Sequence, residues 1–205
     1  MDQRRTDLAV EAAQLWRERG GVGALPGVES RESKREGYPV TTVKILECRG
    51  EQALGKPAGT YVTLTLEGLA RRENDAFGRA ARAVAAELTP LLKLSKGSPV
   101  LVVGLGNRSI TPDDIGPKAA DHTMVTRHLV EQVPEHFGSF RPVAALAAGV
   151  LGPTGVESGE LVRAVAEKVR PACVIVVDAL ASRSLSRVCT TVQLADTGIG
   201  PGPGV

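Results

Sequence analysis

Apolar positions recur with two different periods in the first half of the chain, which separates predicted helices from predicted strands. Helical spacing over residues 8–18 and 74–94 predicts two helices, the second with Pro90 near its end. Alternating β-branched residues predict strands over 41–48 and 60–66, either paired in a hairpin or adjacent in a sheet. The first half is therefore expected to run helix, strand, strand, helix.

Glycine, proline and charged residues separate these elements. They predict a loop over 20–37 and a turn-rich stretch over 50–59. The chain ends in a glycine- and proline-rich stretch, 198–205, without a closing element. We therefore expect the chain to be truncated at its C-terminus.

The second half alternates short apolar runs with helical patterns. This order is typical of βαβ units, which build a mostly parallel sheet covered on both faces. The fold class predicted from it is α/β, with three α/β/α layers. The predicted strands are 100–103, 143–147, 173–177 and 190–195, and the predicted helices are 117–133 and 159–169.

Composition narrows the class of protein. A chain of 205 residues with 42% hydrophobic content can bury one substantial core, so one domain is expected. A net charge of +2, with acidic and basic residues interspersed, argues against direct nucleic-acid binding. The three cysteines have no CxxC spacing, which argues against a disulfide framework or zinc site and fits a reducing cytoplasm. The N-terminus lacks an export signal and no apolar stretch is long enough to span a membrane.

Acidic residues follow two of the predicted strands. Asp113 and Asp114 come after strand 100–103, and Asp196 comes after strand 190–195. Ligands of open α/β sheets bind beyond the carboxyl ends of parallel strands, so acids placed there can take part in chemistry. Each acid taken alone is better explained as a turn or helix-capping residue.

Two such strand ends in one sheet would favour a catalytic interpretation. Carboxylates that face each other cannot both ionise easily, so one keeps a proton while the other activates water. Asp178, at the end of strand 173–177, is a third candidate that could orient the others. Its alternative role is again a turn cap.

Other familiar sites are weakly supported. Gly104 and Gly106 begin a dinucleotide-binding fingerprint, but Ser109 replaces its third glycine, so a simple tight turn is favoured. His122 lies beside Asp121 on a predicted helix, where a surface histidine is a more common reading than a metal ligand. There is no GxSxG motif for a serine nucleophile.

Several longer blocks resemble a known family from the N-terminus to the last residue. Together they are similar to the germination protease of endospore-forming bacteria, whose members continue past the end of this chain. The blocks are 5–12, 59–64, 101–107, 111–118, 140–142, 149–157, 177–184 and 196–199.

The resemblance implies an endopeptidase with a fold similar to hydrogenase maturation endopeptidases. Its expected substrates are the small acid-soluble spore proteins, degraded in the cytoplasm of the forespore and spore core. It also implies a homotetramer. No cofactor, no membrane and no direct nucleic-acid partner is expected. The family is regarded as an atypical aspartic protease, and its two proposed catalytic aspartates fall on Asp113 and Asp196, with Asp114 and Asp178 as possible supporting acids.

The resemblance also implies a zymogen that processes itself. Family substrates are cut after the acidic residue of Thr-Glu-Ile-Ala or Thr-Glu-Phe-Ala, and Thr6-Asp7-Leu8-Ala9 mimics that pattern. We therefore expect cleavage between Asp7 and Leu8. Residues 1–7 would be the propeptide and 8–205 a single α/β protease domain.

Two alternatives remain open on the sequence. Asp114 gives the acid loop a likeness to hydrogenase maturation proteases, in which the counterpart acid helps bind a metal, so a metal-dependent processing peptidase is the first. The second is a catalytically silent α/β protein that binds a small anion through its glycine loop.

Overall fold

The computed structural model describes residues 6–18 and 25–199. They divide into two compact units. Unit 1 contains the described residues up to Lys93 together with Leu180–Gly198, and unit 2 contains Leu94–Ala179 and Ile199. The assignment of 8–205 to one domain stays a prediction.

Unit 1 is built on a four-stranded antiparallel sheet with the order β1-β2-β3-β7. A tight hairpin joins β1 to β2 through Glu36 and Gly37, both of which have positive φ, at 50° and 85°. Positive φ at both central residues is the backbone of the turn that matches the twist of two antiparallel strands. The strands are β1 (Val28–Arg35), β2 (Tyr38–Ile45), β3 (Gly59–Thr65) and β7 (Thr191–Ala195).

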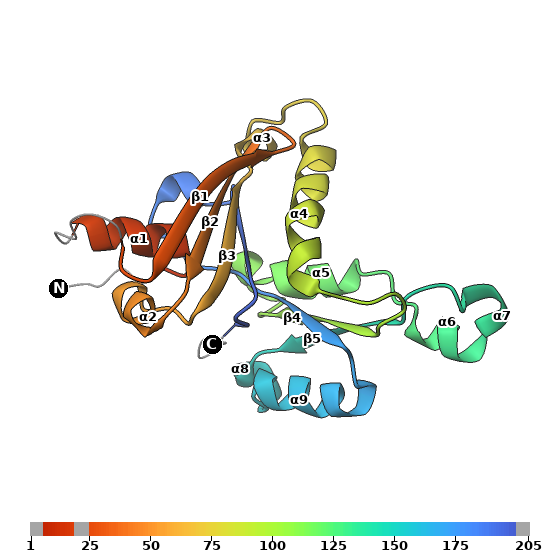
Figure 1. The fold of residues 1–205 in the computed structure, drawn as a ribbon. Coiled ribbons are helices and arrows are strands. Elements are labelled where there is room, and N and C mark those ends of the chain that lie inside the picture. The colour runs from red at the N-terminus through yellow and green to blue at the C-terminus, as the bar shows by residue number, and fades with distance from the viewer. Residues whose placement is uncertain (1–5, 19–24, 200–205) are drawn as a thin grey trace. The chain divides into compact units, whose positions relative to one another are not determined.

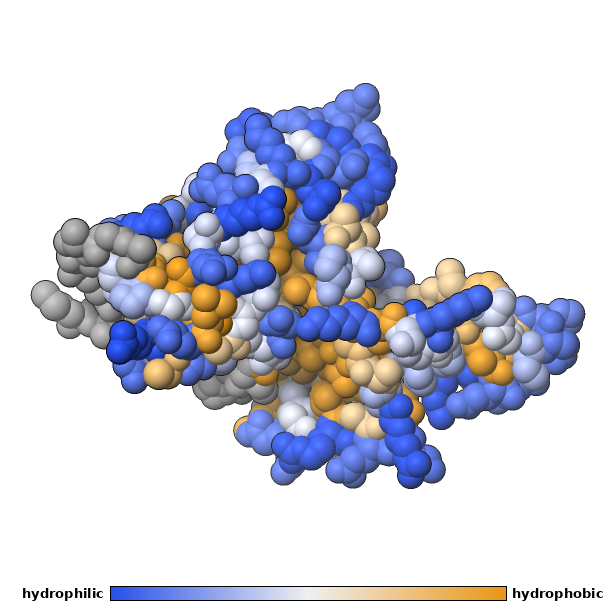
Figure 2. Space-filling model, viewed as in Figure 1, coloured by the Kyte–Doolittle hydropathy of each residue, from blue (hydrophilic) through white to orange (hydrophobic). Residues whose placement is uncertain are grey.

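Helices cover both faces of this sheet (Figure 1). Side chains alternate between the faces, so β2 sends Val43 to one side and Val40 to the other. Val43 packs with Leu8, just before helix α1 (Ala9–Glu18), and with the end of α2 (Cys48–Leu54). Val40 packs with α4 (Ala76–Leu92), and a short helix α3 (Glu67–Ala70) precedes α4. The surface around α3 is hydrophilic in the view of Figure 2.

Unit 2 contains a three-stranded parallel sheet with the order β5-β4-β6. The apolar side chains Leu101, Val103 and Leu105 of its central strand pack against α9, whose outer surface is hydrophilic (Figure 2). Gly104, on the other face, contacts α5. The strands are β4 (Val100–Leu105), β5 (Val143–Gly149) and β6 (Cys173–Val177), and the helices are α5 (Ile115–Asp121), α6 (Arg127–Gln132), α7 (Pro134–Phe137), α8 (Leu151–Thr154) and α9 (Ser158–Val169).

The α/β class is confirmed, and unit 2 has the predicted parallel sheet between helical layers (Figure 1). The strand predicted at 190–195 is β7, and it belongs instead to the antiparallel sheet of unit 1. Local periodicity cannot distinguish these outcomes because it identifies a strand without naming its partner.

Three local predictions are wrong. The predicted loop 20–37 contains β1, whose charged sequence has no apolar alternation, while 20–24 lie outside the described residues. The predicted turn 50–59 contains most of α2. The helix predicted over 117–133 is divided into α5 and α6, because the backbone leaves the helix after Asp121. The predicted loop at 198–205 lies mostly outside the described residues.

No helix within 6–18 and 25–199 combines the length and apolar character that crossing a bilayer demands.

Candidate functional site

The acid loop of unit 2 follows β4 and carries Asp113. This residue ends a short 3-10 helix, η1 (Thr111–Asp113), which Pro112 helps to begin. The half-buried carboxylate accepts a hydrogen bond from the backbone N–H of Asn107 through Oδ2, at 2.6 Å. This bond orients the carboxylate toward the strand end that precedes it.

Two glycines in β4 and its following turn let the loop approach closely. A Cβ on Gly104 would lie 2.0 Å from the carbonyl oxygen of Gly116 in α5. A Cβ on Gly106, where φ is 120°, would lie 2.0 Å from the carbonyl oxygen of Asp113. The glycines favoured from the sequence as a simple turn therefore also position the acid.

Asp114 is held differently from its neighbour. Its side chain is only 13% exposed, and Oδ2 forms an ion pair with Lys118 Nζ at 3.0 Å, one turn along α5. The other oxygen, Oδ1, is buried without a hydrogen-bond partner in the structure. Burying such an oxygen costs folding free energy unless a hydrogen-bond donor or a cation binds it.

A metal is one group that could bind the buried oxygen of Asp114, but the residues of 6–18 and 25–199 do not fit one. Within the described residues no three His, Cys, Asp or Glu side chains converge on a point as metal ligands must. His122 is exposed, and its Nδ1 contacts the backbone oxygen of Lys118 at 2.9 Å. Arg108 engages the neighbouring Asp121 through two bonds, of 2.5 and 2.8 Å, which lowers the pKa of Asp121.

Asp178 directly follows β6, the strand beside β4. The side chain is half-buried, and Oδ1 accepts a hydrogen bond from the N–H of Ala179 at 2.8 Å. Since β4 and β6 are parallel neighbours, Asp113 and Asp178 follow the same edge of one sheet. The prediction that both acids follow strands of a parallel sheet is confirmed, and their roles stay predictions.

Asp196 follows β7, in unit 1. The exposed carboxylate accepts a hydrogen bond from the N–H of Thr60 through Oδ1, at 2.7 Å. Gly59, with φ of 151°, permits this approach, since a Cβ there would lie 2.7 Å from the same oxygen. Burial raises the pKa of the adjacent Tyr61, and the Asp196 charge adds to that effect.

The strands before Asp113 and Asp196 therefore lie in two different sheets, one in each unit. The expectation that both acids follow strands of a single sheet is wrong. What the two acids share is local: each follows a strand, and each has one oxygen held by a backbone amide.

The segment around Asp7, the predicted cleavage position, is docked within unit 1. Backbone N–H of Asp7 donates to the carbonyl of Ala181 at 3.0 Å, and the Asp7 carboxylate accepts from the Ala181 N–H at 2.7 Å. Gln193 of β7 spans the next residues, donating to the Asp7 carbonyl at 2.9 Å and accepting from the Ala9 N–H at 2.8 Å. The exposed Asp7 leads directly into Leu8, which is fully buried. Of the predicted propeptide, residues 1–5 lie outside the described residues.

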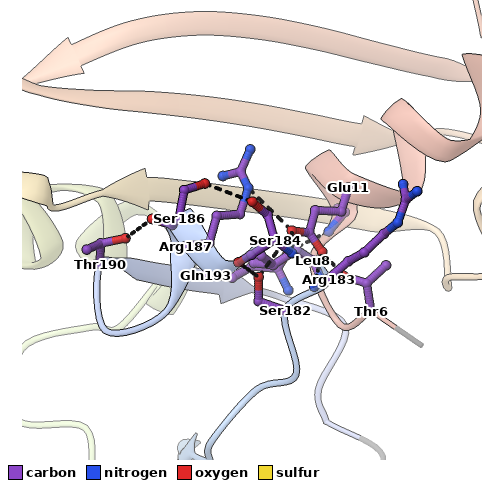
Figure 3. A network of polar contacts seen from close by, with 11 residues as sticks. Thr6, Leu8, Glu11, Ser182, Arg183, Ser184, Ser186, Arg187, Thr190 and Gln193 are labelled. Atoms are coloured by element: carbon purple, nitrogen blue, oxygen red, sulfur yellow. Dashed lines mark hydrogen bonds and ion pairs between the residues drawn. The ribbon is translucent and has the colours of Figure 1, made fainter. Parts of the chain in front are cut away.

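One buried carboxylate, that of Glu11 in α1, organises this region (Figure 3). Glu11 is 2% exposed. It accepts hydrogen bonds from the Thr6 hydroxyl at 2.5 Å and from the N–H groups of Arg183 and Ser184 at 2.8 and 3.1 Å. The Ser182 hydroxyl donates a further bond at 3.1 Å, and Arg187 Nε lies 3.5 Å from Oε1. Thus α1 and the segment 182–187 are joined through a single side chain.

These donors decide the ionisation of Glu11. Burial raises its pKa, but the hydrogen bonds from Thr6 and from the amides of Arg183 and Ser184 outweigh burial, so the pKa lies below its ordinary value. Lys56, whose charge interacts with that of Asp7, is partly buried, which is unusual for a lysine. Burial lowers the pKa of Lys56, while the charge of Asp7 opposes that change.

Sequence reasoning missed Glu11, Gln193 and the segment 182–187. Glu11 lies three residues after Leu8, on the apolar face of the predicted N-terminal helix, where a charge is unexpected. That misplaced charge, together with the resemblance of blocks 5–12 and 177–184, was the available signal. Gln193 carried none, because a polar residue in a strand is ordinary.

Comparison with known proteins gives the family. The sequence matches the germination protease family over residues 6–205. It is 49% identical to the germination protease of Caldanaerobacter subterraneus over 98% of this chain and 61% of that protein. It is 43% identical to that of Clostridium tetani, covering 98% and 62%, and 42% identical to that of Bacillus cytotoxicus, covering 98% and 56%. The chain thus spans about three fifths of the length of these relatives, and it belongs to the germination protease family.

Proposed function

We propose that this chain carries the two catalytic carboxylates, Asp113 and Asp196, of an aspartic endopeptidase that degrades small acid-soluble spore proteins during germination. The observation that carries the proposal is the family match over residues 6–205. The location in the forespore and spore core, and the assembly of four subunits, are part of the same proposal.

In the proposed reaction one carboxylate acts as base and the other as acid. The ionised carboxylate removes a proton from water, and the resulting hydroxide attacks the peptide carbonyl carbon. When the C–N bond breaks, the protonated carboxyl gives its proton to the leaving amine. Backbone amides of Asn107 and Thr60 support these roles because they orient one oxygen of each acid.

We propose supporting roles for the other two acids. Asp178 follows the strand beside that of Asp113, and its half-buried carboxylate is fixed by the next amide. Asp114 binds Lys118, which keeps a positive charge beside the acid loop. We assign both to positioning, with no bond to the substrate.

We further propose that the chain is made as a zymogen and cuts its own Asp7–Leu8 bond. Two features of the docked segment support this. Asp7 supplies the acidic residue, and its carboxylate is already held by the Ala181 N–H. Gln193 contacts the carbonyl of the bond to be cut. Since Leu8 and Ala9 are fully buried, the segment must open locally before the bond can be reached.

Intact-mass spectrometry over time tests both parts of the proposal in one experiment. The unmodified chain should lose residues 1–7, whereas Asp113→Asn and Asp196→Asn should slow that loss by about 10²-fold or more. Asp121→Asn is the matched control, because this exposed aspartate of α5 pairs only with Arg108 in the described contacts and should leave the rate unchanged.

The outcomes separate the alternatives. Full-rate cutting in either asparagine variant would remove that carboxylate from the mechanism. Loss of cutting on chelation, restored by zinc or nickel, would favour the metal-dependent alternative over the aspartic one. If no chain is cut, the same assay with a Thr-Glu-Ile-Ala peptide and the full-length protein distinguishes an inactive fragment from a wrong mechanism.

A further inference from the structure

A single hydroxyl group separates the backbone nitrogen of Leu8 from the buried carboxylate of Glu11. The N–H of Leu8 donates to Thr6 Oγ1 at 3.1 Å. That hydroxyl donates in turn to Glu11 Oε2 at 2.5 Å (Figure 3). Thr6 therefore links the predicted cleavage position to the centre of the polar network.

Hydrolysis of the Asp7–Leu8 bond would change both ends of this link. Water supplies oxygen to the new carboxylate of Asp7, and the nitrogen of Leu8 becomes a protonated amine. Departure of residues 1–7 then takes away the Thr6 hydroxyl and leaves Glu11 Oε2 without that donor. A positive charge is created at the place where a donor is lost.

We propose that the new ammonium group of Leu8 replaces the Thr6 hydroxyl and forms an ion pair with Glu11, locking the processed form of the chain. This inference rests on the proposed cleavage between Asp7 and Leu8. It adds a regulatory contact that exists only after processing.

Packing keeps the new terminus close to Glu11. Leu8 and Ala9 are fully buried in the core beneath α1. The N–H of Ala9 remains bound to Gln193 Oε1 at 2.8 Å, an interaction that cleavage does not touch. Leu8 directly precedes α1, and a glutamate at the third position of a helix can reach back to the backbone nitrogen of the residue before that helix, so Glu11 stays close to the new terminus.

Glu11 is suited to receive a cation. Its present donors are the neutral groups of Thr6, Ser182 and two backbone amides, and its nearest cation in the described structure, Arg187, lies at 3.5 Å. Arg183, although adjacent, directs its guanidinium to Glu18 at 2.9 Å. A charged donor forms a stronger bond to a buried carboxylate than the hydroxyl that it replaces.

The ion pair would act on the chain that leads to Asp196. The segment 182–184 is bound to Glu11, and it continues through η2 (Leu185–Arg187) into β7. Asp196 follows β7 directly. Stronger contacts to Glu11 therefore stabilise the segment that leads to Asp196, one of the two proposed catalytic acids.

The test uses chains that begin at Leu8, released from an N-terminal fusion, so that it does not depend on self-cleavage. One carries a free amine and the other an acetylated amine, which keeps an N–H but has no charge. We expect the free amine to lower the unfolding equilibrium constant by about tenfold or more relative to the acetylated chain, measured in denaturant. In Glu11→Gln the difference between the two chains should disappear.

An NMR titration gives a readout without any substitution. With a ¹⁵N-labelled Leu8, the pKa of its amine should lie above the roughly 7.7–8.0 of a free terminus. Equal stability of the two chains, a difference that persists in Glu11→Gln, or an amine pKa at or below that range would overturn the ion pair. Failure of the chain to cut itself, with these results intact, would overturn only the proposed self-processing.

Discussion

The carboxylate of Glu11 collects donors from two parts of unit 1 that are far apart in sequence. Thr6 lies before α1, and Ser182–Ser184 lie after the last parallel strand. A buried charge is tolerated only where hydrogen bonds replace its lost water. The network therefore couples the folding of the N-terminal segment to that of segment 182–187.

Replacing Glu11 with Gln should destabilise unit 1 and flatten its response to acid. The folded pKa of Glu11 is lowered, so its contribution is fully present above the unfolded pKa, about 4.3, and is lost as the pH falls through the folded value. We expect a loss of about 2 kcal/mol at pH 7 that shrinks progressively as the pH falls below about 4.3, measured by urea unfolding across the acid range.

Glu18→Gln in the same helix is the matched control. This side chain is 57% exposed and pairs with Arg183 at the surface, so its removal should change stability by less than about 1 kcal/mol. Two results would contradict the role given to Glu11. One is an equal loss of stability in both variants, and the other is a Glu11→Gln chain whose stability falls with acid as steeply as that of the unmodified chain.

At the scale of elements, the strand end that carries Asp113 depends on close contact between β4 and α5. Gly104 and Gly116 meet with no room for a side chain, and the carbonyl of Gly116 lies where a Cβ would be placed. Such backbone contacts cannot relax as a flexible side chain can. The acid loop is therefore tied to the packing of a helix on a sheet.

Gly104→Ala should destabilise unit 2 by about 3 kcal/mol or more, since α5 must move away from β4. Gly159→Ala, in α9 of the same unit, should be neutral or slightly stabilising, because no atom lies within 4 Å of its added Cβ and alanine favours a helix. Thermal unfolding of both variants measures the contrast. Equal melting temperatures would show that the contact between β4 and α5 relaxes easily.

At the scale of the whole molecule, the chain leaves unit 1 at Lys93, builds unit 2 and returns at Leu180 to add β7. Consequently Asp113 belongs to one unit and Asp196 to the other. The proposed mechanism nevertheless needs both carboxylates in a single chemical step. The cleavage rates of single and double variants therefore test whether the two carboxylates act together.

The double variant Asp113→Asn/Asp196→Asn should be no slower than the slower single variant, because residues that act in the same step lose their effect together. Cleavage of a Thr-Glu-Ile-Ala peptide, compared as kcat/KM, measures this. Losses that multiply would mean that the two acids act independently. Asp113→Asn/Asp121→Asn serves as the control and should match Asp113→Asn alone.

Local sequence was sufficient for elements that carry their own pattern. Helix α1, strands β2 to β6 and helices α4 and α9 were predicted because apolar periodicity and glycine or proline boundaries act over a few residues. The family was recognisable for a related reason, since each of its blocks is contiguous in the sequence. The placement of Asp113, Asp178 and Asp196 after strands followed from the same patterns.

Partnership between distant segments was beyond that reasoning. Charged β1 is a strand because β2 pairs with it along its whole length, and β7 joins β3 although its own pattern suits either kind of sheet. The burial of Glu11 depends on the backbone amides of Arg183 and Ser184, which lie 172 and 173 positions later in the sequence. Hydrogen bonding and burial across such separations depend on the packing of the folded chain, so they appear only when those segments meet.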